Sequence, residues 1–423
     1  MNGRQLKLLE SIDNAIASVD NASQSTITTV YGKVAGVDAA LDCWAWKGIP
    51  FAKPPVGDLR WKAPQDPEPW SKVRQYNQSY SHCTQSPLSM EWIPLNTITG
   101  SEDCLYLDIY APKNPSGKLP VYFWIHGGGN FVGGADELTW CSILARVSNV
   151  VVVVIQYRLG PFGFFTHPAL NPKGTPEDKS GNYGVLDQIK ALKWVQRNIA
   201  HFGGDPGNVM ITGESAGGFN TLNLMISPLA KGLFHKALVQ SAGGKNIPVP
   251  SGVVKANAVI DKLLVADGTC KNLTRAADLR ASMPPSKIEA YLRKKTGEQI
   301  LQVMLYANGL TEPINPFIDK VVIPGKLAAV FESGDYNKVP VIIGNNADEM
   351  KPFMPQYLGF VPTSTGLTWS NVFNVIGLAR DMALIFLSSL DMMSVFGGFP
   401  SPKPIGKAGE PLRRLSCLMW RHS

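Results

Sequence analysis

The sequence has no uninterrupted apolar segment long enough to cross a membrane. A membrane-spanning helix needs about 20 predominantly apolar residues, and the nearest candidate, residues 382–400, is broken by Asp391 and by serines and glycines. Residues 1–20 also lack the continuous apolar stretch of a secretory signal peptide. We therefore expect no transmembrane segment and no signal peptide, but an N-terminal extension over residues 1–27.

The excess of one sign of charge over the other is small as well. The 423 residues contain 40 Lys and Arg against 33 Asp and Glu, a formal net charge of +7. Much of this excess lies in residues 392–423, where five basic residues face Glu410 alone. No basic stripe with interleaved aromatic residues occurs elsewhere, so the sequence argues against nucleic-acid binding.

Metal-binding patterns are absent too. The spacing of the six cysteines fits no zinc motif, and we expect no metal and no organic cofactor. From the residues alone, the cysteines are either buried free thiols or the partners of one or two disulfides. They are Cys43, Cys83, Cys104, Cys141, Cys270 and Cys417.

The chain does contain alternating strand and helix patterns. With 44% hydrophobic residues it has ample material for a large core. Short apolar runs predict strands at residues 119–125, 149–159, 208–212, 235–243 and 339–346. Helical spacing predicts helices at residues 187–200 and 215–226, and further helices within 253–300. This alternation predicts an α/β fold, a mostly parallel central sheet with helices on both faces.

The pattern Gly213-Glu214-Ser215-Ala216-Gly217 joins one of these strands directly to a helix. A G-x-S-x-G sequence in this context is typical of a sharp turn that exposes a nucleophilic serine at the end of a sheet. The alternative is a glycine-rich turn with an idle serine. The flanking strand and helix favour the nucleophile.

Two further motifs complete this chemistry. The run from His126 to Gly129 follows an apolar strand, and its N–H groups, together with that of Ala216, predict a hole for an oxyanion. The pair Asp348-Glu349 follows the strand at 339–346, where an acid of a serine triad would lie. A solvated acidic loop is an equally good interpretation of that pair on its pattern alone.

Together these segments resemble the type-B carboxylesterase/lipase family, which includes the cholinesterases. The resemblance covers about residues 28–350 and implies an α/β-hydrolase fold and carboxylic ester hydrolysis. It is carried by WKGIPFAKPPVGDLRWKAP (46–64), SEDCLYLDIYAP (101–112), PVYFWIHGGGNFVGG (120–134), YRLGPFGFF (157–165), the long segment 181–218 and PVIIGNNADE (340–349).

The resemblance also assigns roles to single residues. It implies that Ser215 is the nucleophile, that Glu349 is the triad acid, and that Gly128, Gly129 and Ala216 donate to the oxyanion. It implies a disulfide between Cys83 and Cys104 near the mouth of the site. It further implies that Glu214 and Ser241 are buried polar residues behind the triad.

One element of the family pattern is missing, because no histidine in an H-G-x-E context follows Glu349. The one histidine after that residue is His422, in MWRHS, and the triad histidine is therefore unknown. We expect the other histidines to be structural or solvated. Residues 381–423 match nothing in the family, so we divide the chain into the extension, a hydrolase domain over 28–380, and a truncated or divergent basic tail over 381–423.

The sequence thus predicts a serine carboxylesterase that acts on small carboxylic esters and is impaired as encoded. A non-catalytic cholinesterase-like binding or adhesion protein and a lipase of the same family are the alternatives. The implied disulfide predicts a secreted or periplasmic location, although a cytoplasmic one stays open without a visible signal peptide. Ester specificity and oligomeric state do not follow from the sequence.

Overall fold

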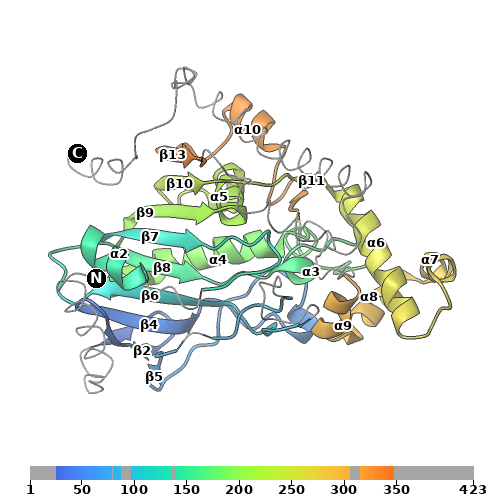
Figure 1. Cartoon of the computed structure of the whole chain (residues 1–423), viewed down its shortest axis with the longest axis horizontal. Coiled ribbons are helices and arrows are strands. Elements are labelled where there is room, and N and C mark those ends of the chain that lie inside the picture. Colours follow the sequence, from blue (N-terminus) through green and yellow to red (C-terminus); the bar gives the residue numbers. More distant parts are fainter. Residues whose placement is uncertain (1–24, 79, 87–96, 136–139, 305–314, 347–423) are drawn as a thin grey trace, which may run out of the picture.

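The computed structural model describes residues 25–78, 80–86, 97–135, 140–304 and 315–346 (Figure 1). The predicted division into extension, domain and tail stays a prediction, because residues 1–24 and 347–423 lie outside this description.

A mixed sheet of eight strands forms the centre of the described molecule, in the order β13-β10-β9-β7-β8-β6-β4-β3. The strands from β13 to β8 in this order run parallel, and β6, β4 and β3 continue the sheet in antiparallel pairs. Their bounds are β3 (Val37–Ala39), β4 (Cys43–Pro50), β6 (Tyr106–Pro112), β7 (Leu119–Ile125), β8 (Val151–Ile155), β9 (Gly204–Glu214), β10 (Lys236–Gln240) and β13 (Val341–Gly344).

Two small sheets and the helices surround this centre. The small sheets are β1 (Thr26–Thr28) with β2 (Lys33–Ala35) and β5 (Arg74–Gln75), and β11 (Ile247–Pro248) with β12 (Phe317–Ile318). The helices are α2 (Trp140–Ser148), α3 (Gly160–Gly163), α4 (Tyr183–Asn198), α5 (Ala216–Ile226), α6 (Val249–Ala266), α7 (Leu273–Ser282), α8 (Pro285–Lys294), α9 (Gly297–Gln302) and α10 (Leu327–Ser333). Within the described part of the chain, none of them is long and apolar enough to span a bilayer.

Strand β8 shows how the sheet divides the core into two layers. Val152 and Val154 pack with residues of α2, whereas Val151, Val153 and Ile155 join the larger cluster that includes α4 and α5. All five residues are fully buried, because a strand covered on both faces alternates its side chains between two apolar layers. The predicted α/β architecture, a central sheet with helices on both faces, is therefore confirmed.

The predicted elements are present with shifted ends. The strand predicted at 149–159 stops at Ile155, because Tyr157 and the residue after it turn away into buried polar contacts. The strand predicted at 208–212 begins earlier, since Gly204 already pairs with Leu119 across an irregular register. The region 253–300 contains four helices, α6 to α9, which lie beside the sheet and away from its centre (Figure 1).

The register of β7 and β9 determines where the two glycine motifs emerge. These parallel neighbours pair Ile125 with Gly213 as their last partners. The chain after β7 continues into His126, and the chain after β9 continues into Ser215, so both motifs leave the same edge of the sheet side by side. Ligand sites of open α/β sheets lie at this carboxyl edge.

Candidate active site

The predicted nucleophile Ser215 lies between β9 and α5 in a conformation that side chains rarely adopt, with φ 55° and ψ −119°. Its N–H donates to the carbonyl of Gln240 over 3.0 Å, and its own carbonyl accepts from the N–H of Phe219 over 2.9 Å. The residue is half-buried. The backbone is therefore fixed at both ends of the turn, as a sharp strand-to-helix turn requires.

The glycines around Ser215 are required by close backbone approach. A Cβ atom on Gly217 would lie 2.0 Å from the carbonyl oxygen of Ile125, and one on Gly213 would lie 2.4 Å from the carbonyl carbon of Gly217. A Cβ on Gly218 would come within 2.7 Å of the carbonyl oxygen of Gln240. Only residues without a side chain let α5 begin this close to β7 and β10.

The loop after β7 passes directly beside the serine. A Cβ placed on Gly127 would lie 3.4 Å from the Cβ of Ser215. Gly128 and Gly129 follow with φ of 98° and 63°, values that favour glycine. Within the described residues the N–H groups of both make no hydrogen bond, and Ala216 is the first residue of α5, where a helix leaves N–H groups without an intrahelical acceptor. The positive end of the helix dipole lies at the same place.

A buried polar network connects this loop to the helix of the nucleophile. The side-chain oxygen of Asn130 accepts from the Asn220 amide of α5 over 2.8 Å and from the Tyr157 hydroxyl over 3.3 Å. That hydroxyl also lies 2.9 Å from the carbonyl oxygen of His126. Burial raises the pKa of Tyr157, so the hydroxyl remains a donor at every physiological pH. The sequence did not identify these three residues, although an asparagine directly after a glycine run, here with φ 62°, is a signal for a left-handed turn.

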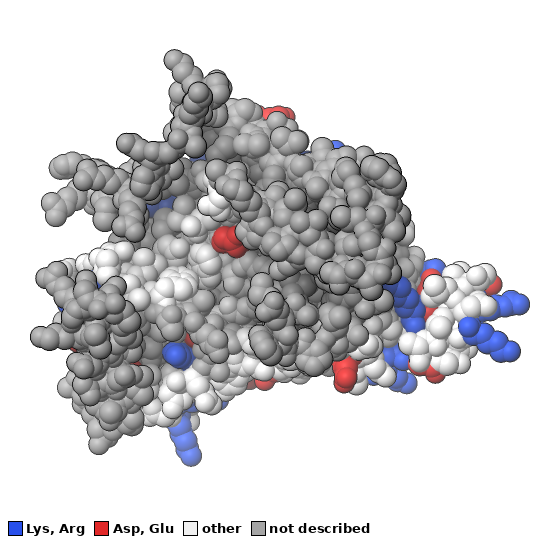
Figure 2. Space-filling model, in the orientation of Figure 1, with Lys and Arg blue, Asp and Glu red and all other residues white. Residues whose placement is uncertain are grey.

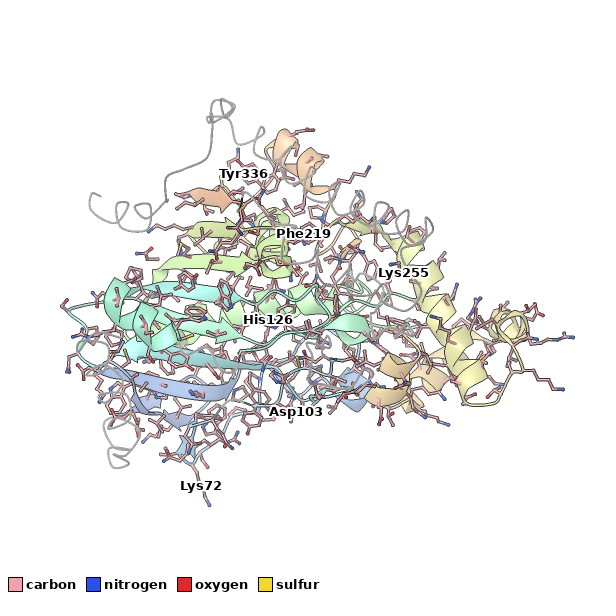
Figure 3. The ribbon with its side chains drawn as sticks, in the orientation of Figure 1. Lys72, Asp103, His126, Phe219, Lys255 and Tyr336 are labelled. Atoms are coloured by element: carbon pink, nitrogen blue, oxygen red, sulfur yellow. A yellow bond between two sulfur atoms is a disulfide. The ribbon has the colours of Figure 1, made fainter. Side chains whose placement is uncertain are left out.

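Three of the described histidines, His126, His167 and His235, have structural surroundings. The ring of His126 lies at the end of β7 (Figure 3), stacks on Tyr157 with centroids 4.4 Å apart and contacts the carbonyl of Gly127 through Nδ1 at 2.9 Å. His167 contacts Asn257, and His235 accepts from a backbone N–H. Among the described residues, no histidine ring hydrogen-bonds to Ser215.

The two residues expected behind the triad differ from one another. Ser241 is buried, has φ 47° and donates its N–H to the carbonyl of Gly344. The expectation that Glu214 is buried is wrong, because this residue ends β9 at the open carboxyl edge of the sheet and its side chain is exposed. It nonetheless lies against the glycine loop, since a Cβ on Gly127 would be 3.0 Å from its Oε2.

The predicted acid Glu349 lies outside the described residues, and so does His422. The strand that leads to Glu349 is described up to its end. β13 pairs with β10, and Asn346, just beyond β13, donates to the hydroxyl of Ser241 over 3.3 Å. In the order of the sheet, β10 alone separates β13 from β9, the strand that leads to Ser215.

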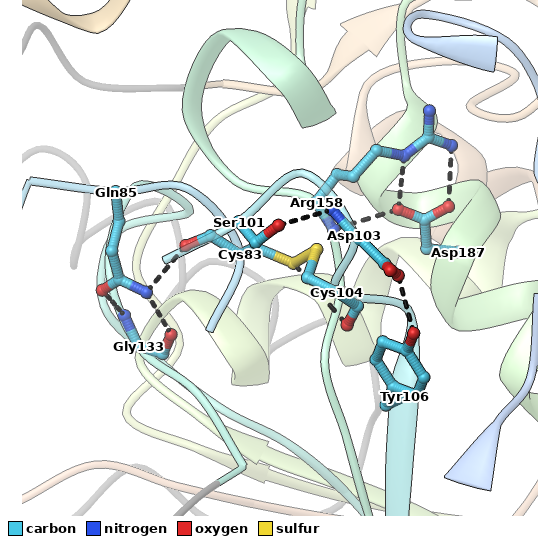
Figure 4. Close-up of a disulfide and its surroundings, with 9 residues drawn as sticks. All are labelled: Cys83, Gln85, Ser101, Asp103, Cys104, Tyr106, Gly133, Arg158 and Asp187. Carbon is cyan, nitrogen blue, oxygen red and sulfur yellow. Dashed lines mark hydrogen bonds and ion pairs between the residues drawn. A yellow bond between two sulfur atoms is a disulfide. The ribbon is translucent and has the colours of Figure 1, made fainter. Parts of the chain in front are cut away.

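Figure 4 shows the predicted disulfide between Cys83 and Cys104, which the structure confirms. The side chain of Gln85, two residues beyond Cys83, donates to the carbonyls of Cys83 over 3.1 Å and Gly133 over 2.8 Å, and accepts from the N–H of Gly133 over 2.9 Å. A Cβ on Gly133 would in turn lie 2.8 Å from the carbonyl oxygen of Gly127. The disulfide is thus connected to the glycine loop through one glutamine. Of the other described cysteines, Cys43 and Cys141 are buried free thiols and Cys270 is a partly buried one.

A small apolar cavity lies away from the serine. Its volume is about 190 Å³, and it lies between α6 and the residues around α3 and β12. Neither Ser215 nor the glycine loop lines it. Its lining includes Phe164, Phe165, Val259, Met304 and Phe317, with Lys255 and Lys262. Among the described residues no group of His, Cys, Asp and Glu is arranged to bind a metal ion.

Comparison with known proteins agrees with this architecture. A model of the carboxylesterase family matches residues 23–369. Carboxylesterase 1E of Rattus norvegicus is 38% identical over 374 residues, which covers 82% of this chain and 63% of the rat protein. Liver carboxylesterase of Sus scrofa is 37% identical over 385 residues, covering 83% and 64%.

Solved structures give the same result. A PNB esterase is similar at a TM-score of 0.66 and 34% identity, over 83% of this chain and 68% of that structure. A carboxylesterase of Geobacillus stearothermophilus is similar at a TM-score of 0.66 and 30% identity, over 83% and 67%. The chain spans 63% to 64% of the length of the two mammalian relatives. With a family match over most of its residues and the fold of the esterases, the chain belongs to the carboxylesterase family.

Proposed function

We propose that this protein is a carboxylic ester hydrolase that forms an acyl-enzyme on Ser215. The observation that carries the proposal is the strained turn at Ser215 beside the glycine loop after β7, where a Cβ atom added to Gly127 would lie 3.4 Å from the serine Cβ. Membership of the carboxylesterase family supports the same reaction. The substrate class is small carboxylic esters.

The residues have distinct roles in this reaction. The hydroxyl oxygen of Ser215 attacks the carbonyl carbon of the ester while a histidine takes its proton, and the N–H groups of Gly128, Gly129 and Ala216 hold the oxyanion. The intermediate collapses, the alcohol leaves with that proton, and water then hydrolyses the acyl-enzyme. Glu349 holds the imidazole in the productive tautomer and stabilises its charged form.

The proposal includes an impairment of this polypeptide. No histidine of its 423 residues stands in the family context, and a serine hydroxyl is a weak nucleophile near pH 7 without an adjacent base. Glu349 cannot replace the imidazole, because its role is behind the ring. The oxyanion hole and substrate binding alone leave an acceleration of about a thousandfold to ten-thousandfold over water.

Chemical rescue separates the reaction from its impairment. Turnover of a p-nitrophenyl ester is measured on the full chain with and without added imidazole, with Ser215→Ala as the matched control for direct hydrolysis by imidazole. We expect slow turnover, raised by imidazole in the wild type alone and accompanied by labelling of Ser215 by an organophosphonate. Equal rates in wild type and Ser215→Ala under both conditions would contradict the proposed nucleophile.

Other results of the same assay would contradict the proposed impairment or favour one of the alternative functions. Robust turnover without imidazole that is lost in both Ser215→Ala and His422→Ala would mean that His422 completes the triad. Binding of an ester analogue without turnover or serine labelling under any condition would favour the non-catalytic alternative. A preference for long-chain over short-chain esters would favour the lipase.

We also propose export to an oxidising compartment, secreted or lumenal. The Cys83–Cys104 disulfide supports this, since disulfides persist outside the reducing cytosol. Alkylation of the protein taken from its native compartment, followed by peptide mapping without reduction, tests the proposal. We expect both cysteines to be protected, and two alkylated thiols would overturn it.

A further inference from the structure

The segment between α6 and α7 carries a sequence that the ester chemistry does not use. Asn272-Leu273-Thr274 has the form N-x-T, the acceptor sequence for attachment of an oligosaccharide to asparagine in exported proteins. The triplet has no proline at its middle position. It is the one such triplet in the chain whose three residues all lie in the described part, since Asn21 and Asn77 begin triplets that do not.

Its three residues are accessible. Asn272, Leu273 and Thr274 are all exposed, and the apolar side chain of Leu273 is 53% exposed. Helix α7 lies at one extremity of the molecule, far from the carboxyl edge of the sheet (Figure 1). Figure 2, in the same orientation, shows that extremity as a projection that other parts of the chain leave uncovered in this view.

The oxygen and the nitrogen of the Asn272 side-chain amide have different contacts. Its oxygen accepts from the N–H of Arg275 over 3.0 Å and so caps α7, while the residue itself is extended with φ −160° and ψ 169°. Among the described contacts, its amide nitrogen has no acceptor. A sugar attached to that nitrogen leaves the carbonyl oxygen in place, so the modification and the helix cap are compatible.

We propose that Asn272 is an N-glycosylation site. The side-chain nitrogen of Asn272 bonds to the anomeric carbon of an oligosaccharide carried on a polyprenyl pyrophosphate, the bond from that carbon to the phosphate oxygen breaks, and the lipid pyrophosphate leaves. The amide proton passes to a base of the transferase, and nothing is oxidised or reduced. The attached sugar covers Leu273 and the adjacent turn. The proposal rests on the export inferred from the disulfide and is independent of ester hydrolysis.

Helix α7 keeps its place without the sugar, which makes the test clean. It packs on α6 through the buried Ala276 and through an ion pair of Arg280 with Asp261, whose Nε–Oδ1 distance is 2.7 Å. Thr274→Ala removes the acceptor sequence and leaves the cap by Asn272 intact. Thr274→Ser keeps the acceptor sequence and serves as the matched control.

The full chain is expressed in cultured eukaryotic cells behind a cleavable signal sequence for the secretory pathway. The purified protein is deglycosylated by an amidase in water enriched in heavy oxygen, which marks each glycosylated asparagine as labelled aspartate, and its peptides are mapped. We expect label at residue 272 in the wild type and in Thr274→Ser, and its loss in Thr274→Ala.

Two results would overturn the proposal. One is an unmodified Asn272 peptide from wild-type molecules that carry the Cys83–Cys104 disulfide in the same digest, which shows that they reached the oxidising compartment. The other is equal label in wild type and Thr274→Ala, which shows spontaneous deamidation. Peptides that contain Asn21 and Asn77 are resolved separately and do not enter either result.

Discussion

The strained backbone at Ser215 should lower the free energy of unfolding of the protein. With φ 55° and ψ −119°, Ser215 lies in a region that is accessible without strain only to glycine. Such outliers cost about 1–3 kcal/mol each. Ser215→Ala removes the hydroxyl and keeps the β carbon that causes the strain, whereas Ser215→Gly removes both.

The difference between these two variants isolates the strain. Glycine gains about 1–3 kcal/mol by relief of the conformation and loses about 0.5–1 kcal/mol through its greater freedom in the unfolded chain. Ser215 is half-buried, so removal of one methyl group leaves little cavity. We expect Ser215→Gly to exceed Ser215→Ala in the free energy of unfolding by about 1 kcal/mol.

Ser227 supplies the matched control, because it stands at the other end of the same helix. It follows α5 with φ −78° and ψ 123°, an ordinary extended conformation, and it is fully buried. Here glycine should be less stable than alanine, by about 0.5–1 kcal/mol. Urea unfolding followed by tryptophan fluorescence gives the four values. If the glycine-minus-alanine difference has the same sign at both positions, the strain at Ser215 contributes nothing measurable and the reasoning is wrong.

Three further predictions concern the frame of the site. Asp187→Leu leaves the buried guanidinium of Arg158 without its carboxylate and should lower the free energy of unfolding by about 3–5 kcal/mol. Most of this loss should be recovered when Arg158→Met is added. If the losses of the two substitutions instead add up in the double variant, this reasoning is wrong. Gly217→Ala should lower the unfolding midpoint and destroy serine labelling together, since its Cβ meets a carbonyl oxygen at 2.0 Å, and unchanged labelling would contradict the packing argument. Burial raises the pKa of Asp66, but its hydrogen bond with Lys190 and other partners outweighs burial and lowers that pKa to about 2, below the unfolded value of about 3.9. Its stabilising contribution is therefore complete above about pH 4 and is lost as the pH falls through about 2. Lys190→Met should flatten the pH dependence of the unfolding midpoint in that window.

Local patterns in the sequence predicted the elements and the glycine motifs well. Strand β7 matches its predicted bounds of 119–125, and α5 begins one residue after the predicted start at Ser215. These features depend on neighbours in the chain: apolar runs define the strands, and glycine is needed wherever the backbone approaches another backbone. Gly213 and Gly217 stand at two such positions of close backbone approach.

Contacts between distant residues were beyond such patterns. The amide of Asn220 meets Asn130 from 90 positions along the chain, and Gln85 meets Gly133 from 48 positions away. Neither Asn220 nor Gln85 belongs to a motif. Asn220 meets its partner because α5 begins beside the loop after β7, and Gln85 meets Gly133 because the segment after Cys83 lies against the same loop. The burial of Glu214 was expected from the resemblance to the family and not from a pattern in this sequence, and its exposure follows from its position at the end of β9.

The bridge by Gln85 has a thermodynamic consequence. The glutamine joins Cys83 to Gly133, and Gly133 packs on Gly127. If the glycine loop binds an anion as proposed, this bridge couples anion binding at the loop to the redox equilibrium of the two cysteines. Linkage between two equilibria is reciprocal. If oxidation of Cys83 and Cys104 orders the loop for an anion, then an anion held there must make the disulfide harder to reduce by the same factor. Reduction of the disulfide by a dithiol buffer would then weaken anion binding at the loop, and a bound carboxylate would make the disulfide harder to reduce.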